Sequence, residues 1–192
     1  MKLYDAEWAP SPRRVRIFLA EKGVEVESHK LDLRSGEHFS PDFLRRNPCA
    51  TVPCLELDDG TCISETMAIC RYFEEVHPEH PLLGRDALEK AKVEQWLRWL
   101  EFFFFMPTGM CFQHTSGVFK DRMTPIPEWG EECRKNIINF MEFLNSQLAD
   151  RDYICCGRFT AADINAFTTV EFARVVQIRV TDFEMPHLQE WY

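Results

Sequence analysis

Residues 47–75 have the sequence NPCATVPCLELDDGTCISETMAICRYFEE, in which two short apolar runs are followed by a longer amphipathic pattern. The runs PCLEL and TCIS flank DDG, where Asp59 and Gly60 favour the left-handed conformations that a tight hairpin needs. The stretch ETMAICRYFEEV then repeats apolar residues at helical spacing, which is typical of a helix with one buried face. These residues therefore predict two antiparallel strands and a helix.

The residues before this stretch predict the order strand, helix, strand. KLYD precedes a Pro-rich turn, VRIFLAEKG has a helical pattern that ends at Gly23, and VEVESHKLDL is the next strand. SPDFLRRN predicts a short helix with Ser40 as its N-cap and Pro41 at its first position. We therefore expect an α/β domain over 1–77, followed by a Pro-rich linker over 78–85.

The remaining residues, 86–192, predict an all-helical domain. The stretch KAKVEQWLRWLEFFFFM predicts a long helix whose apolar stripe includes Phe103 and Phe104, and a second helix is expected over 131–148. In FTAADINAFTTV, Thr160 and Asp163 have the spacing of a capping box, in which each side chain accepts from the other residue's backbone amide. The residues that follow are apolar on almost every side, which indicates a helix buried within a bundle.

Composition and charge limit the classes of partner and compartment. The chain has 192 residues, 45% of them hydrophobic, and a net charge of −9 that disfavours nucleic acid and anionic membrane surfaces. Neither a signal peptide nor an apolar run of membrane-spanning length is present, so we expect a cytoplasmic protein. The eight cysteines form no CxxC pair, so most are expected to be small buried residues, and no metal is expected.

Several motifs together resemble one known family. The stretch 47–75 is similar to the N-terminal, thioredoxin-like domain of cytosolic glutathione S-transferases, and FTAADI resembles the capping box of their helical C-terminal domain. PRRVRIFLAEKG is closest to bacterial theta-like and nu-like members. The resemblance implies a detoxifying transferase that uses glutathione as cosubstrate and a hydrophobic small-molecule electrophile as second substrate. It also implies a homodimer.

The resemblance implies four contacts with glutathione. Val52-Pro53 would supply a cis peptide bond that leaves the Val52 backbone free to pair with the cysteinyl residue of glutathione. Thr66, where relatives usually have Ser, would hold the γ-glutamyl carboxylate at a helix N-terminus, and Glu65 would pair with the ammonium group. The alternative is a helix cap followed by a first-turn residue. His38 matches the position that reaches the glycyl carboxylate, although a lone His is also common in solvated loops.

The group that activates the thiol is not settled by the sequence. In related classes a Ser or Cys stands where this chain has Ala9, and alanine has no donor. Ser11 stands where nu-like members have an Asn near the sulfur, so the resemblance makes it the candidate catalytic residue. The alternative is that Ser11 caps the first helix, with Pro12 at the first helical position. Trp8 could line the site or be a packing residue.

The second substrate is expected near the first long helix. Phe103, Met106, Met110 and Phe112 offer apolar walls for an electrophile, or are core residues. Reduction of a peroxide by the bound thiolate is a further possibility. Two alternative functions share the fold: a binding or regulatory protein that has lost thiol activation, and a glutathione-dependent isomerase or dehalogenase.

Overall fold

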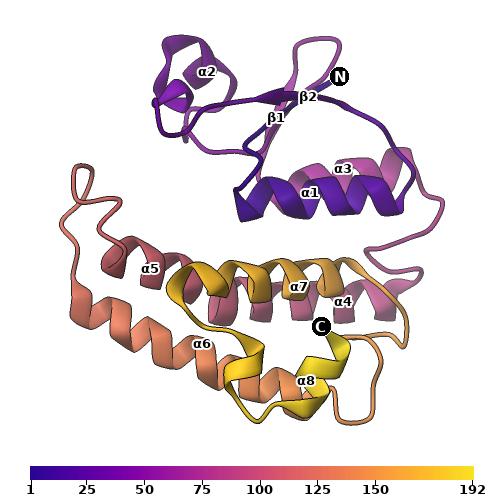
Figure 1. Ribbon diagram of the computed structural model, residues 1–192. Coiled ribbons are helices and arrows are strands. Elements are labelled where there is room, and N and C mark those ends of the chain that lie inside the picture. Colours follow the sequence, from indigo (N-terminus) through magenta and orange to yellow (C-terminus); the bar gives the residue numbers. More distant parts are fainter. The chain divides into compact units, whose positions relative to one another are not determined.

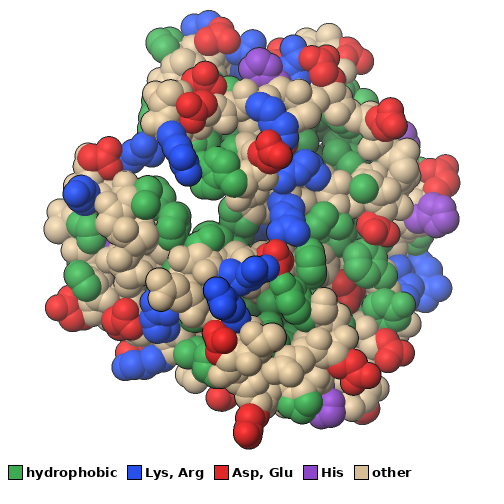
Figure 2. Space-filling model, viewed as in Figure 1, with side chains coloured by type: hydrophobic (Ala, Val, Ile, Leu, Met, Phe, Trp, Pro, Cys, Tyr) green, Lys and Arg blue, Asp and Glu red, His purple; other side chains and the backbone are tan.

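The computed structural model describes all 192 residues and divides the chain into two compact units, Met1–Leu82 and Leu83–Tyr192. The division falls within the linker predicted over 78–85. Each unit buries its own set of large apolar side chains. On the face shown in Figure 2, acidic, basic and hydrophobic side chains are mixed.

The first unit contains a mixed sheet with the strand order β2-β1-β3-β4. β1 pairs in parallel with β2 and antiparallel with β3, and β3 pairs antiparallel with β4. Gly60 in the hairpin between β3 and β4 has a φ of 85°, a left-handed conformation that glycine adopts without strain. The predicted hairpin is therefore confirmed. The strands are Lys2–Asp5, Glu27–Lys30, Cys54–Glu56 and Cys62–Ser64.

Helices lie on both faces of this sheet. α1 (Pro10–Glu21) and α3 (Thr66–Val76) lie side by side on one face, and α2 (Pro41–Arg46) lies across the sheet from them (Figure 1). A short 3-10 turn, Glu37–Phe39, precedes α2. Ser40 accepts a hydrogen bond from the amide at the third helical position of α2, so its predicted capping role is confirmed.

Tyr4, Glu56 and Arg46 connect β1, β3 and α2. The Tyr4 hydroxyl donates to the Glu56 carboxylate at 2.6 Å, and Arg46 Nε donates to the same oxygen at 2.9 Å. The Arg46 guanidinium also lies 5.3 Å from the centre of the Tyr4 ring. Burial, followed by the bond to Glu56, raises the pKa of Tyr4 to about 12, so the phenol remains a donor throughout the neutral range. These contacts hold α2 against the sheet.

Lys22, just beyond α1, is a buried cation of the first unit. Its side chain is fully buried, and the ammonium lies 2.8 Å from the Glu74 carboxylate on α3. The same ammonium donates to the backbone carbonyls of His77, Glu79 and His80. Lys22 therefore satisfies the open carbonyl at the C-cap of α3, His77, and two carbonyls of the segment that follows.

The second unit is entirely helical, as expected. None of its helices, nor any in the first unit, combines the length and apolar character that crossing a bilayer would need. The bounds are α4 Ala87–Leu100, η2 Glu101–Phe105, α5 Met106–Thr115, α6 Pro127–Gln147, α7 Ala161–Ala173, η3 Arg174–Val176, η4 Val180–Asp182 and α8 Pro186–Trp191.

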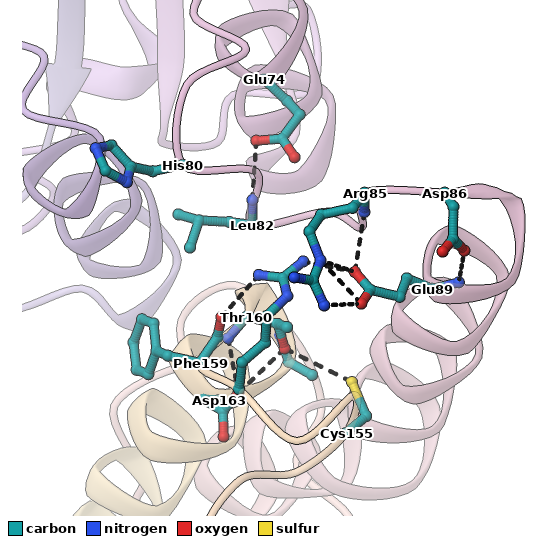
Figure 3. A network of polar contacts seen from close by, with 12 residues as sticks. Glu74, His80, Leu82, Arg85, Asp86, Glu89, Cys155, Phe159, Thr160 and Asp163 are labelled. Atoms are coloured by element: carbon teal, nitrogen blue, oxygen red, sulfur yellow. Dashed lines mark hydrogen bonds and ion pairs between the residues drawn. The ribbon is translucent and has the colours of Figure 1, made fainter.

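The helix that carries the predicted capping box is buried on almost all sides. The Asp163 carboxylate accepts from the Thr160 amide at 2.9 Å (Figure 3). The Thr160 side chain in turn accepts from the backbone amide of Asp163, the third residue of α7. Asp163 also accepts from the Ile154 amide at 2.9 Å and from the Trp191 side chain. The predicted capping box is confirmed, and its carboxylate additionally connects the preceding loop and α8 to α7.

The first long helix differs from the prediction at Phe103. Glu101–Phe105 form a π-helical turn between α4 and α5. This turn interrupts the 3.6-residue spacing on which the predicted stripe depends. Phe104 is fully buried, whereas Phe103 is 56% exposed. The placement of Phe103 on the buried stripe is therefore wrong.

Most of the cysteines are buried, as expected of small apolar side chains. Five are buried, and all eight are free thiols. Desolvation is the largest cause that raises the pKa of Cys54 and of Cys70 to about 12, so both remain protonated thiols at neutral pH.

Replacing Lys22 should destabilise the first unit. Lys22→Met removes the buried ammonium from beside the Glu74 carboxylate and from three backbone carbonyls, and the loss is expected to be about 3 kcal/mol. Urea unfolding measures it. The control is Arg45→Met, which removes an exposed ion pair with Asp42 and should leave the midpoint unchanged. Equal midpoints for the two variants would contradict the role of Lys22.

Asp163→Ala should destabilise the helical unit by roughly 3 kcal/mol, because the backbone amides of Ile154 and Thr160 lose their acceptor. The control is Asp182→Ala, which removes an exposed capping carboxylate from η4 and should cost much less in thermal unfolding. A similar loss in both variants would contradict the assignment.

The effect of Asp163→Ala should also depend on pH. Burial is the largest cause that holds the pKa of Asp163 above its ordinary value, so the folded chain binds this proton more readily than the unfolded chain. The stabilising contribution of this carboxyl therefore decreases as pH rises from about 4 through its raised pKa. The difference between parent and variant should be larger near pH 5 than near pH 7.

Candidate functional site

The peptide bond between Val52 and Pro53 is cis, which confirms the expectation from the sequence. Val52 is half-buried, and its backbone amide and carbonyl take part in no backbone hydrogen bond of the loops or of the sheet. These two groups lie just before β3, at the edge of the first unit's core. They are a donor and an acceptor with the spacing that an extended peptide strand requires.

Asn47 holds the loop that leads to Val52. Its buried side chain donates to the Thr51 carbonyl at 2.8 Å and accepts from the Cys49 amide at 3.1 Å. Ala50 between them has a left-handed φ of 54°. Asn47 was not selected as a site residue in the sequence, although its place before Pro48 marks a turn. The side chain fixes the backbone immediately before the cis bond.

α3 begins at Thr66, and Glu65 occupies the capping position without making a side-chain cap. Glu65 has a φ of 72°, which is uncommon for a residue with a side chain, and it is exposed. Thr66 is buried, and its hydroxyl donates to the Ser11 carbonyl at 3.3 Å. The alternative in which a side chain caps this helix is therefore wrong. The amide end of α3 can instead accept an anion.

α1 begins two residues earlier than the Ser11 capping hypothesis requires. Its N-cap is Ala9, which has no side-chain cap, and Pro10 stands at the first helical position. The capping role of Ser11 is therefore wrong, because Pro10 already supplies the fixed φ that starts a helix. Ser11 instead lies in the first turn, between two prolines that have no N–H.

The first turn of α1 presents a single amide donor. Pro10 and Pro12 have none, and the Arg13 amide bonds to the Ala9 carbonyl at 3.3 Å. The Ser11 amide makes no backbone hydrogen bond. The Ser11 hydroxyl oxygen accepts from the guanidinium of buried Arg14 at 3.1 Å. Because that oxygen is already an acceptor, the hydroxyl hydrogen can be donated outward.

Strand pairing brings the two halves of the candidate site together. Cys54, just after the cis bond, pairs with Ser64, just before Glu65. Val52-Pro53 and the start of α3 are therefore neighbours across the hairpin, and the Thr66 hydroxyl connects the start of α3 to that of α1.

Three other predicted features differ in exposure: His38, Trp8 and the suggested walls of the second-substrate site. His38 is buried, with its ring 3.9 Å from that of Phe39, so it is no solvated loop residue. Trp8 is 62% exposed, so the interpretation as a packing residue is wrong. Of the four residues suggested as walls for a second substrate, Phe103 and Met106 are exposed, and the other two are half-buried.

Two family models match the chain. The glutathione S-transferase N-terminal domain matches residues 8–76, and the glutathione S-transferase C-terminal domain matches residues 127–192. The first match contains the cis Val52-Pro53 bond and the starts of α1 and α3. The second contains α6, α7 and α8.

Known proteins agree with these matches. Glutathione S-transferase 2 of Saccharomyces cerevisiae is 35% identical over 100% of this chain and 84% of its own length. The crystal structure of a glutathione S-transferase domain-containing protein of Marinobacter aquaeolei superposes with a TM-score of 0.90 at 38% identity, covering 100% of this chain and 95% of that one. Maleylacetoacetate isomerase of Pseudomonas aeruginosa is 40% identical over 48% of this chain and 44% of its own. The chain therefore belongs to the glutathione S-transferase family of enzymes, and it has that family's thioredoxin-like N-terminal and all-helical C-terminal domains.

Proposed function

We propose that the protein conjugates the thiolate of glutathione to hydrophobic electrophiles. The observation that carries this proposal is the meeting of two helix N-termini at the Thr66–Ser11 hydrogen bond, beside the cis Val52-Pro53 bond. Amide ends of helices favour negative charge, and glutathione brings carboxylates and a thiolate.

In this proposal glutathione lies along the edge of the first unit. The Val52 amide and carbonyl pair with the cysteinyl backbone of glutathione, and the Thr66 amide and hydroxyl hold the γ-glutamyl carboxylate. Exposed Glu65 pairs with the γ-glutamyl ammonium. His38 is assigned to the glycyl carboxylate on the family resemblance, and no contact in the structure adds to that assignment.

Ser11 is the proposed activating residue. A cysteine thiol has an ordinary pKa of ~8.5, and hydrogen bonds to the sulfur favour the thiolate. Ala9 stands where related classes have the activating group, and its side chain has no donor. Ser11, two residues later, offers two donors: its hydroxyl and the single open amide in the first turn of α1. The thiolate then forms a bond to the electrophilic carbon while the leaving group departs with the bonding electrons. The thiol proton has gone to solvent.

The resemblance and the relatives support a wider proposal. A bound thiolate can also reduce a peroxide, and we include that activity. A homodimer and a role in detoxification are carried over from the family resemblance, and a cytoplasmic location is the expectation from the sequence pattern. The Thr66–Ser11 hydrogen bond gives no information on the peroxidase activity, the location, the oligomeric state or the detoxification role, so each is tested by a separate measurement.

An isomerase is the second candidate function. It is favoured by the similarity to maleylacetoacetate isomerase of Pseudomonas aeruginosa over about half of each chain. In such a reaction the thiolate adds to a double bond and leaves again, so glutathione is not consumed. Turnover of maleylacetoacetate without loss of glutathione would favour this candidate, and binding of glutathione with neither activity would favour a regulatory protein.

Glu65→Ala should weaken glutathione binding at least 10-fold, because the ammonium loses its charged partner. Titration calorimetry measures the affinity. Glu75→Ala is the matched control, since it removes an exposed carboxylate from the last turn of the same helix, and its affinity should equal that of the parent. Absence of glutathione binding in the parent would refute the proposed function.

Ser11→Ala should lower conjugation of an aryl halide at neutral pH by at least 10-fold, with little change in glutathione affinity. The variant keeps the amide but loses the hydroxyl, so the pKa of the bound thiol should rise, as followed by thiolate absorbance. Exposed Ser35→Ala is the control and should behave as the parent. Unchanged turnover in Ser11→Ala would remove the hydroxyl from the mechanism and leave the amide as the only donor.

A further inference from the structure

Two adjacent thiols stand directly before α7, in a part of the helical unit that the proposed conjugation does not use. Cys155 is buried, and Cys156 is partly exposed. Cys156 and Gly157 both have a left-handed φ of 61°, so the chain curls tightly here. The Cys156 thiol is close enough to Cys155 to be among the groups that raise the pKa of Cys155, after burial as the largest cause.

The Cys155 thiol has a defined place beside the capping box. Its sulfur lies 3.6 Å from the Thr160 hydroxyl (Figure 3), and the neighbouring Ile154 amide is held by Asp163. The backbone on either side of the pair is therefore tied to the start of α7. A pair whose sulfurs already lie together loses little further freedom when one ligand atom bridges them.

The number of donors limits what can bind. Nowhere in the chain do three or more His, Cys, Asp or Glu side chains gather as a metal site would need, so a tetrahedral zinc ion lacks ligands here. A linear two-coordinate ion needs its sulfurs on opposite sides of the metal, which the thiols of two consecutive residues in a tight turn do not offer. A monosubstituted trivalent arsenical already carries one carbon substituent and completes its coordination with two sulfurs.

From this match of donor number and spacing we infer that Cys155 and Cys156 form a binding site for monosubstituted trivalent arsenicals. Binding forms two As–S bonds and breaks the arsenic–oxygen double bond of R–As=O. The two thiol protons leave with that oxygen as one water molecule. Arsenic stays trivalent, so the step needs no oxidant or reductant.

Exposure sets the order of the two bonds. Cys156 is open to solvent and reacts first, and Cys155 then closes the ring from within the fold. Burial is the largest cause that raises the pKa of Cys155 to about 12, so this thiol is a poor nucleophile until its neighbour has captured the arsenic. The second As–S bond distinguishes the pair from any single thiol, because a monothiol competitor must displace both sulfurs at once.

Phenylarsine oxide tests the site in the full-length chain. The protein is mixed with one equivalent of the probe, excess glutathione is added as a monothiol competitor, and the retained arsenical is counted by intact-mass spectrometry. The parent should retain about one arsenical per chain and lose it to a dithiol such as 2,3-dimercaptopropanol. Cys156→Ser, at a partly exposed position, should retain essentially none.

Cys62→Ser tests the rival pair of a partly exposed and a buried thiol, Cys62 and Cys54, which lie on the paired strands β4 and β3. It should retain the arsenical as the parent does. Thermal unfolding confirms that each variant is folded. Cys155→Ser should also lose the arsenical, and its serine hydroxyl keeps a polar group beside Thr160. Retention by folded Cys156→Ser, or loss in Cys62→Ser alone, would overturn the assignment.

Discussion

The helical unit depends on one buried carboxylate. Asp163 is 1% exposed and accepts from the amides of Ile154 and Thr160 and from the side chain of Trp191. These partners come from the loop before α7, from the N-cap of α7 and from α8. A charge at such depth is tolerable only when hydrogen bonds replace its hydration, and the open amides at a helix start supply them. α7 can be apolar on nearly every side because this one residue satisfies its polar end.

In the first unit a buried cation lies beside the C-terminal end of a helix. Lys22 places its ammonium among the carbonyls at the end of α3 and beside Glu74. Asp163 therefore stands at a helix start and Lys22 beside a helix end, as the helix dipole favours in each case.

The sequence predicted most of the elements because their signals are local. Ser40, Gly60 and the Thr160–Asp163 pair each determine a turn or a cap within three residues, and each prediction is confirmed. The errors arose where two local signals compete. Ser before Pro fits a cap, yet the preceding Pro10 starts α1 two residues earlier than a Ser11 cap would.

Prediction of the candidate site was less complete, because it depends on contacts between distant residues. The bond from Thr66 to Ser11 and the side-chain clamp of Asn47 on its own loop have no periodic signature. The family motif located Val52, Glu65 and Thr66, but not the orientation of Ser11. That orientation follows from Arg14, one helical turn later, and from the removal of competing amides by the flanking prolines.

The π-helical turn between α4 and α5 has a further consequence for how the helical unit tolerates changes of length. A π turn holds one residue more than an α-helical turn, and each residue of an α-helix turns the chain by about 100°. Winding Glu101–Phe105 as an ordinary α-helix would rotate all of α5 by about 100° relative to α4, whereas deleting one of these residues would restore a regular α-helical turn and keep the phase of α5. The π turn therefore absorbs the extra residue, and Phe104 lies in the core while Phe103 is exposed.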